Sequence, residues 1–114
     1  MADDAVRAVS AYFQAWKEKD FERYQALLAD DVSFVGPLGT ADGPEECREG
    51  IEHLAEITTD IDIVKQFVDG EDVLTWFDLH TTIAPPAPVA NWSHVEDGRI
   101  TRIRVTFDSR PLTN

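Results

Sequence analysis

Residues 73–82 read VLTWFDLHTT, residues 89–95 read VANWSHV, and residues 100–108 read ITRIRVTFD. These runs are rich in β-branched and aromatic residues and are bounded by Pro, Gly and Asp, a pattern typical of consecutive antiparallel strands. Asp97-Gly98 separates the second run from the third and supplies the positive φ angles of a hairpin turn. The sheet that these runs predict is expected to form the wall of any functional site.

Upstream of the sheet, the hydrophobic period is mostly helical. Apolar residues recur every three or four positions over residues 4–18 and 21–28, which predicts two amphipathic helices. Residues 32–35 predict a short strand, and Gly43-Pro44 begins a third helix with proline in its first turn. From Ile61 the period changes to two, and residues 61–68 predict a further strand, joined to residues 73–82 by a hairpin turn.

The predicted order is helix, helix, strand, helix and four long strands. This order is typical of an α+β fold in which three N-terminal helices pack on one face of a curved antiparallel sheet. A chain of 114 residues is long enough for one hydrophobic core and too short for two. We therefore expect a single domain that spans residues 1–114.

Composition excludes several kinds of partner. The formal net charge is −12 and the pI is near 4.4, so nucleic acid and anionic membrane surfaces would repel the chain. The single cysteine, Cys47, rules out an internal disulfide and fits a reducing compartment. The N-terminal residues form neither a basic region nor an apolar run, so we expect a soluble cytoplasmic protein.

Several motifs resemble the nuclear transport factor 2-like superfamily, which includes ketosteroid isomerases, SnoaL-like polyketide cyclases and limonene epoxide hydrolases. They are Leu28-Ala-Asp-Asp-Val32, Gly43-Pro-Glu45, Glu96-Asp-Gly-Arg-Ile-Thr101 and Phe107-Asp-Ser-Arg110. The resemblance extends over residues 5–112. It implies a cone whose concave sheet and helices enclose an apolar pocket, often in a homodimer formed through the outer face of the sheet.

The resemblance supplies part of a ketosteroid isomerase site. Tyr12 matches the oxyanion-hole tyrosine of the first helix, and Asn91 approximately matches a hydrogen-bond-donating Asp of the penultimate strand. Gly36 stands where the catalytic Asp of those enzymes would be, so that base is absent. Against limonene epoxide hydrolases, Asp78 matches the aspartate of a central strand, while Trp76 and Val105 replace the other two site residues.

A candidate acid/base pair lies on the predicted strand over residues 73–82. Residues two apart on a strand share a face, so Trp76, Asp78 and His80 project together, and the resemblance implies that they project into the cone. An Asp beside a His in an apolar cavity suits general acid/base chemistry near neutral pH. The other interpretation is a structural polar pair, or a His80 exposed at the strand end.

The enzyme hypothesis assigns a role to each of these residues. Asp78 is the base, His80 is its partner or acid, and Tyr12 and Asn91 donate hydrogen bonds to a developing oxyanion. The remaining pocket-lining residues are expected to be large and mainly apolar: Trp16, Phe34, Trp76, Val105 and Phe107. No motif or ligand spacing predicts a metal or a nucleotide cofactor, so none is expected.

The outer face of the predicted sheet has the composition of an interface. If Asn91 and Ser93 face the cone, then Trp92, His94, Arg102 and Arg104 lie outside, and the same assignment places Phe77 beside them. Aromatic residues and arginine are enriched in protein interfaces. This pattern predicts a homodimer through that face, and the alternative is a monomer with Arg side chains stacked over Trp92.

Two functional hypotheses follow. In the first, the protein binds a small hydrophobic or polyketide-like molecule and promotes a cofactor-free isomerisation, cyclisation or dehydration. In the second, it is a non-catalytic ligand-binding or dimerisation module of the same fold, which Gly36 and Trp76 favour.

Overall fold

The computed structural model describes residues 2–113, and its elements confirm the predicted α+β fold. They are, in chain order, α1 (Ala2–Glu18), α2 (Phe21–Ala26), β1 (Leu28–Gly36), β2 (Gly39–Asp42), α3 (Gly43–Ala55), β3 (Thr58–Asp69), β4 (Asp72–Thr81), β5 (Ala87–Glu96), β6 (Arg99–Thr106) and α4 (Arg110–Thr113). The sequence analysis did not predict the short elements β2 and α4. None of the described helices is long and apolar enough to cross a membrane.

The strands form one curved, unclosed sheet in the order β2-β1-β6-β5-β4-β3. Neighbours are antiparallel except β1 and β6, which run parallel, so the expectation of a purely antiparallel sheet was wrong at this pairing. A two-residue hairpin forces the strands that it joins to be antiparallel, but β1 and β6 are far apart in the chain and carry no such constraint. The two residues of the β5–β6 turn, Asp97 and Gly98, have positive φ angles of 52° and 79°, as the sequence predicted for this hairpin.

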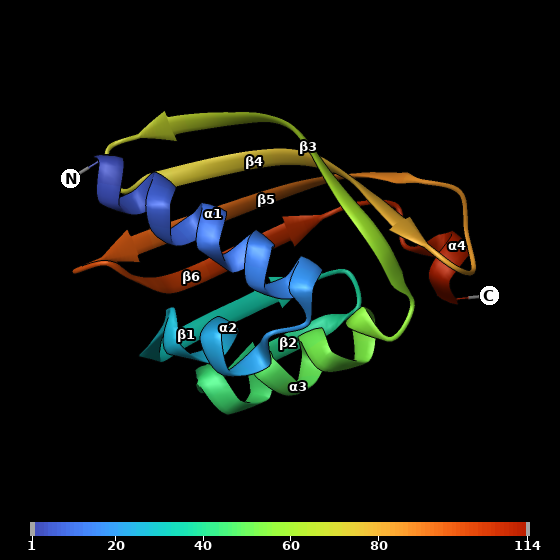
Figure 1. Cartoon of the computed structure of the whole chain (residues 1–114), viewed down its shortest axis with the longest axis horizontal. Helices are drawn as coiled ribbons and strands as arrows, with labels where there is room; N and C mark the ends of the chain where they lie inside the picture. The colour runs from blue at the N-terminus through green and yellow to red at the C-terminus, as the bar shows by residue number, and fades with distance from the viewer. Residues whose placement is uncertain (1, 114) are drawn as a thin grey trace.

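Helices α1, α2 and α3 cover the concave side of the sheet (Figure 1). α1 lies across β3, β4, β5 and β6, α3 lies beside β1 and β2, and α2 contacts β1 and α3 (Figure 1). Helix α1 buries a stripe of side chains at helical spacing against the sheet, among them Val9, Phe13 and Trp16. Pro44 is in the first turn of α3, where its missing N–H removes no helical hydrogen bond, and Glu46 Oε1 accepts from the Asp42 N–H at 3.0 Å.

The two faces of β4 are the reverse of what the sequence analysis expected. Phe77 is 1% exposed and Leu79 is buried beside it on the concave face, whereas Trp76 is 45% exposed. Asp78 and His80 lie on the same outer face as Trp76 and are half-buried. The prediction that Trp76, Asp78 and His80 face the cone was therefore wrong, as was the placement of Phe77 outside.

Hydrophobic burial explains this orientation. The buried set of β4 consists of Val73, Thr75, Phe77 and Leu79, which carries no charge, while the other set includes Asp78 and His80. Turning the first set outward would expose an aromatic and two aliphatic side chains and would desolvate a carboxylate. On β5 and β6 the predicted faces are confirmed: Asn91 and Ser93 are buried, and Trp92 and Arg102 are exposed.

Candidate functional site

A small cavity lies between α1, α3 and the concave face of the sheet, with a volume of about 60 Å³. We call it the inner chamber. Among residues 2–113, the residues that line it are all uncharged: Tyr12, Trp16, Phe34, Gly36, Pro37, Leu38, Ile51, Leu54, Phe77, Leu79, Val89, Asn91, Val105 and Phe107. Of the residues predicted to line the pocket, the structure brings together Tyr12, Trp16, Phe34, Asn91, Val105 and Phe107. It excludes Trp76.

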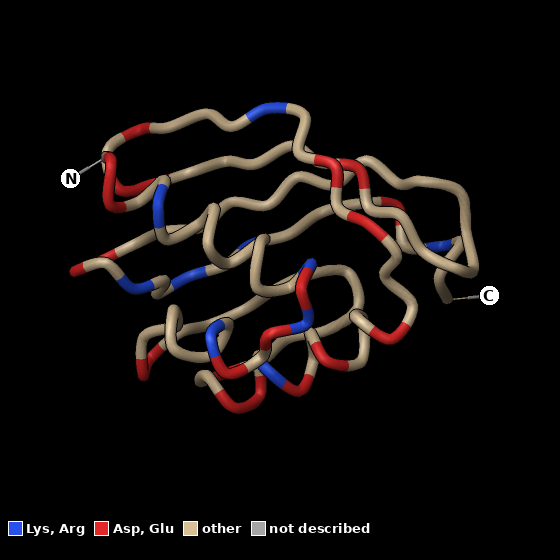
Figure 2. Tube along the Cα trace, viewed as in Figure 1, with Lys and Arg blue, Asp and Glu red and all other residues tan. Residues whose placement is uncertain are grey.

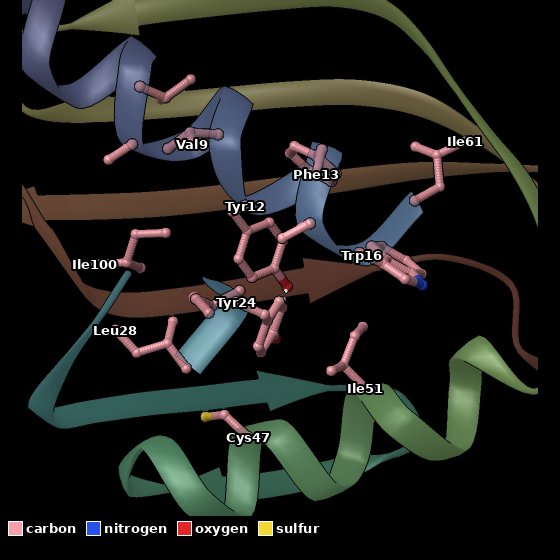
Figure 3. Packing of buried hydrophobic residues seen from close by; sticks show 14 of the residues in the cluster. Val9, Tyr12, Phe13, Trp16, Tyr24, Leu28, Cys47, Ile51, Ile61 and Ile100 are labelled. Atoms are coloured by element: carbon pink, nitrogen blue, oxygen red, sulfur yellow. Dashed lines mark hydrogen bonds between the residues drawn. The ribbon is translucent and has the colours of Figure 1, made fainter. Parts of the chain in front are cut away.

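A buried chain of polar side chains ends at the hydroxyl of Tyr12. The Tyr24 hydroxyl donates to Tyr12 Oη at 3.3 Å, and Figure 3 shows the two rings from α1 and α2 with their oxygens together. Ser93 Oγ donates to Asn91 Oδ1 at 2.8 Å, which leaves the Asn91 amide nitrogen for its hydrogen bond to Tyr12. All four side chains are buried.

This environment keeps Tyr12 protonated. Burial raises its pKa to about 12, and the hydrogen bonds from Tyr24 and Asn91 lower the pKa only in part. Burial also raises the pKa of Tyr24 well above its ordinary value. Tyr12 therefore accepts from two neighbours and retains its own proton, which leaves its hydroxyl able to donate a hydrogen bond.

Trp16 is the second polar group of α1 in the chamber wall. Its ring packs on Phe13 with centroids 6.2 Å apart and meets Phe77 edge-on at 5.9 Å. The side chain is 4% exposed, and Nε1 has no hydrogen-bond partner among residues 2–113. The sequence analysis predicted Trp16 as an apolar wall residue and did not identify this free donor.

A larger hollow adjoins the inner chamber on the side of α3. This outer groove has a volume of about 730 Å³ and lies between α3 and the β1–β2 hairpin. Four residues belong to the walls of both spaces: Phe34, Leu38, Ile51 and Leu54. Cys47 lies in the groove wall, where burial raises the pKa of its thiol to about 11, so the thiol stays protonated and is a poor nucleophile at neutral pH.

Gly36 stands at the position that matches the catalytic Asp of ketosteroid isomerases, and the packing around it leaves little room for a side chain. A Cβ atom at this residue would lie 3.1 Å from Cε1 of Phe34, closer than most real Cβ contacts. The ring of Phe34 thus takes up the space that a side chain at position 36 would need. The chamber wall contains no carboxylate at this point.

The predicted acid/base pair lies outside the chamber. Asp78 pairs in register with Asp62 of β3, and His80 pairs with Asp60. Both side chains project from the outer face of the sheet, on the opposite side from Tyr12. A general base must reach the proton that it removes, so Asp78 and His80 cannot act on a molecule in the inner chamber.

The outer face of the sheet carries a row of residues in register across five strands. The row consists of Val35, Arg104, Trp92, Leu74 and Phe67, and its apolar members are each at least 40% exposed. Asp72 anchors Trp92 and His94 beside the row, with contacts of 2.9 Å to Trp92 Nε1 and 2.8 Å to His94 Nδ1. Acidic positions gather on α3 and near strand ends, while the middle of the sheet is mostly uncharged (Figure 2).

The comparisons with known proteins agree with this architecture. Residues 9–103 match the SnoaL-like domain. A structure from Kribbella flavida DSM 17836 is 31% identical with a TM-score of 0.87, and the match covers 93% of this chain and 88% of that one. An NTF2-like protein of unknown function from Cytophaga hutchinsonii ATCC 33406 is 26% identical with a TM-score of 0.82, over 96% of this chain and 95% of that one.

An LEH-like epoxide hydrolase from M. tuberculosis is 27% identical, with a TM-score of 0.80 over 94% of this chain and 84% of that one. A search of curated proteins gave no match. The family match covers most of the chain, and a curved sheet with helices on its concave face is the fold of these structures. The chain belongs to the SnoaL-like domain family and has the NTF2-like fold that its sequence predicted.

Proposed function

We propose that the inner chamber binds one small, neutral, mainly apolar molecule through a hydrogen bond from Tyr12 to a carbonyl or similar acceptor. The observation that carries this proposal is the buried chain of Tyr24, Asn91 and Ser93, which fixes the Tyr12 hydroxyl as a protonated donor. An apolar cavity with a few convergent polar groups is the usual form of a small-molecule site. The uncharged wall favours a neutral ligand, because an ion would lose its hydration without compensation.

The two adjoining spaces indicate how such a molecule fits. The chamber, at about 60 Å³, is smaller than typical ligand pockets, which have volumes of roughly 300 to 1,000 Å³. The outer groove falls in that range, and Phe34 and Leu38 form part of the wall between the spaces. We infer that the acceptor end of the ligand occupies the chamber and that a larger apolar body extends toward the groove.

This arrangement favours a binding role over acid/base catalysis. Tyr12, Asn91 and Trp16 present hydroxyl, amide and indole groups, which are neutral at physiological pH. Such donors polarise a carbonyl, which is one half of enolisation chemistry. The other half is a proton acceptor, and the carboxylate and imidazole that the sequence suggested for it lie on the outer face.

Tyr12→Phe tests the proposal with cyclohexanone as the probe. Deleting the hydroxyl removes one hydrogen bond, so we expect the dissociation constant to rise by roughly 2- to 10-fold. The measurement is a titration followed by protein chemical shifts, with Asp78→Asn as the matched control on the outer face. A large effect of Asp78→Asn with none of Tyr12→Phe would overturn the chamber as the binding site.

We also propose that the outer face of the sheet pairs with a second copy of the chain. A two-fold axis that runs along the strands between β4 and β5 would set Leu74 against the partner's Trp92. The same operation would bring Arg102 against the partner's Asp69, because both residues lie on one register line, on strands β6 and β3, which flank the axis equally. The exposed apolar row and this charge complementarity support a homodimer in which Trp76, rather than Phe77, joins the predicted interface residues.

Leu74→Glu tests this interface. Leu74 is 40% exposed at the centre of the proposed contact, so a charge there is expected to convert a dimer into a monomer at micromolar concentration. Ile83→Glu is the control, because Ile83 is 54% exposed in the β4–β5 loop, away from the row. Sedimentation equilibrium measures both variants, and a wild-type protein that sediments as a monomer contradicts the proposal.

A further inference from the structure

Trp16 carries a hydrogen-bond donor that the protein itself does not use. Its indole lies in the chamber wall and is 4% exposed. Within residues 2–113, Nε1 has no hydrogen-bond partner. Buried side-chain donors in folded proteins usually have one, because an unpaired buried donor costs free energy. An acceptor on a bound molecule would remove that cost.

Packing does not account for the indole nitrogen. The ring contacts that hold Trp16 are made with Phe13 and Phe77, and both are contacts between aromatic rings. A phenylalanine ring would make contacts of the same kind without burying an N–H group. The aromatic packing of Trp16 therefore does not require its indole nitrogen.

The donor groups of Trp16 and Tyr12 point in different directions. They lie one helical turn apart on α1, where Cβ atoms are about 5 to 6 Å apart. Figure 3 shows the Tyr12 oxygen directed toward Tyr24, while the indole nitrogen is at the end of the Trp16 ring that points away from Tyr12. Because the two donors point in different directions, they favour two separate acceptors on a bound molecule.

We propose that the ligand carries two hydrogen-bond acceptors, of which one binds Tyr12 and the other binds Trp16 Nε1. The uncharged wall makes this ligand a neutral compound such as a cyclic diketone or a keto ester. This inference rests on the proposed function and names the class of molecule for the same site.

Two matched probes test it, cyclohexanone and cyclohexane-1,4-dione, which share one ring and differ in the second carbonyl. We expect wild type to bind the dione about tenfold more tightly than the monoketone. Trp16→Phe keeps a ring and removes the N–H, so the preference for the dione over cyclohexanone should fall to within about twofold. Thermal unfolding of Trp16→Phe confirms that the variant is folded before binding is measured.

The possible failures are distinguishable. Equal binding of both probes to wild type, or an unchanged preference in Trp16→Phe, overturns the second acceptor and leaves the Tyr12 site intact. If neither probe shifts the resonances of chamber residues, both the proposed function and this inference fail. If Tyr12→Phe weakens both probes while Trp16→Phe removes the preference for the dione, both the proposed function and this inference stand.

Discussion

Phe77→Ala is expected to lower the free energy of unfolding by about 3 to 5 kcal/mol, whereas Trp76→Ala lowers it by less than about 1.5 kcal/mol. Phe77 is 1% exposed and packs against Phe13 and Trp16, so its removal leaves a cavity in the core. Trp76 is the larger side chain but is 45% exposed on the outer face. Urea unfolding followed by circular dichroism measures both variants.

The comparison of Phe77→Ala with Trp76→Ala tests which face of β4 is buried. Both measurements need the same protein concentration, because a dimer contact at Trp76 would make stability depend on concentration. If Trp76→Ala were the more destabilising change, the faces of β4 would be those that the sequence analysis first assigned, and Asp78 and His80 would return to the cone.

Alkaline pH is expected to destabilise the protein through Tyr12. Burial raises the pKa of Tyr12 from 10.0 to about 12 in the folded state, so above pH 10 the unfolded chain releases a proton that the folded chain retains. The stability that Tyr12 contributes is complete below pH 10 and is lost as pH rises toward 12. By linkage, its share of the loss is roughly 1 to 1.5 kcal/mol at pH 11 and about 2 to 3 kcal/mol beyond pH 12.

Urea unfolding at about pH 9 and pH 11 measures this loss. Tyr12→Phe removes the Tyr12 share, so the variant should lose less stability than wild type between the two pH values. Tyr24 also has a raised pKa and continues to contribute in the variant. The comparison is made in a Cys47→Ala background, because the pKa of the Cys47 thiol, about 11, lies in the same range. An equal loss with and without the Tyr12 hydroxyl contradicts the buried, protonated state of this residue.

Most of the fold could be predicted from local sequence signals. Periodicity located the three main helices and the long strands, and Asp97-Gly98 and Pro44 marked a turn and a helix start that the structure contains. The parallel pairing of β1 with β6 has no local signal, because it joins strands that are distant in the chain. The period of two on β4 defined two faces but did not tell which one is buried.

The site was predictable only in part, because the sequence pattern did not tell which face of β4 points into the molecule. Tyr12 and Asn91 were expected as donors, and the structure places both on the chamber wall. The composition of β4 held a usable signal, since the set that contains Phe77 and Leu79 is uncharged and the set that contains Asp78 is not. No spacing rule predicts that the hydroxyls of Tyr12 and Tyr24, from two helices, meet.

The indole N–H resonances of the three tryptophans test the central claim most directly. A nitrogen–proton correlation spectrum is recorded while cyclohexane-1,4-dione is added, with each signal assigned by Trp→Phe substitution. The Trp16 signal should move downfield as its N–H gains an acceptor, while the signals of Trp76 and Trp92, which lie on the outer face, stay in place. Movement of the Trp76 signal with a stationary Trp16 signal would place the ligand on the outer face and contradict a binding site in the inner chamber.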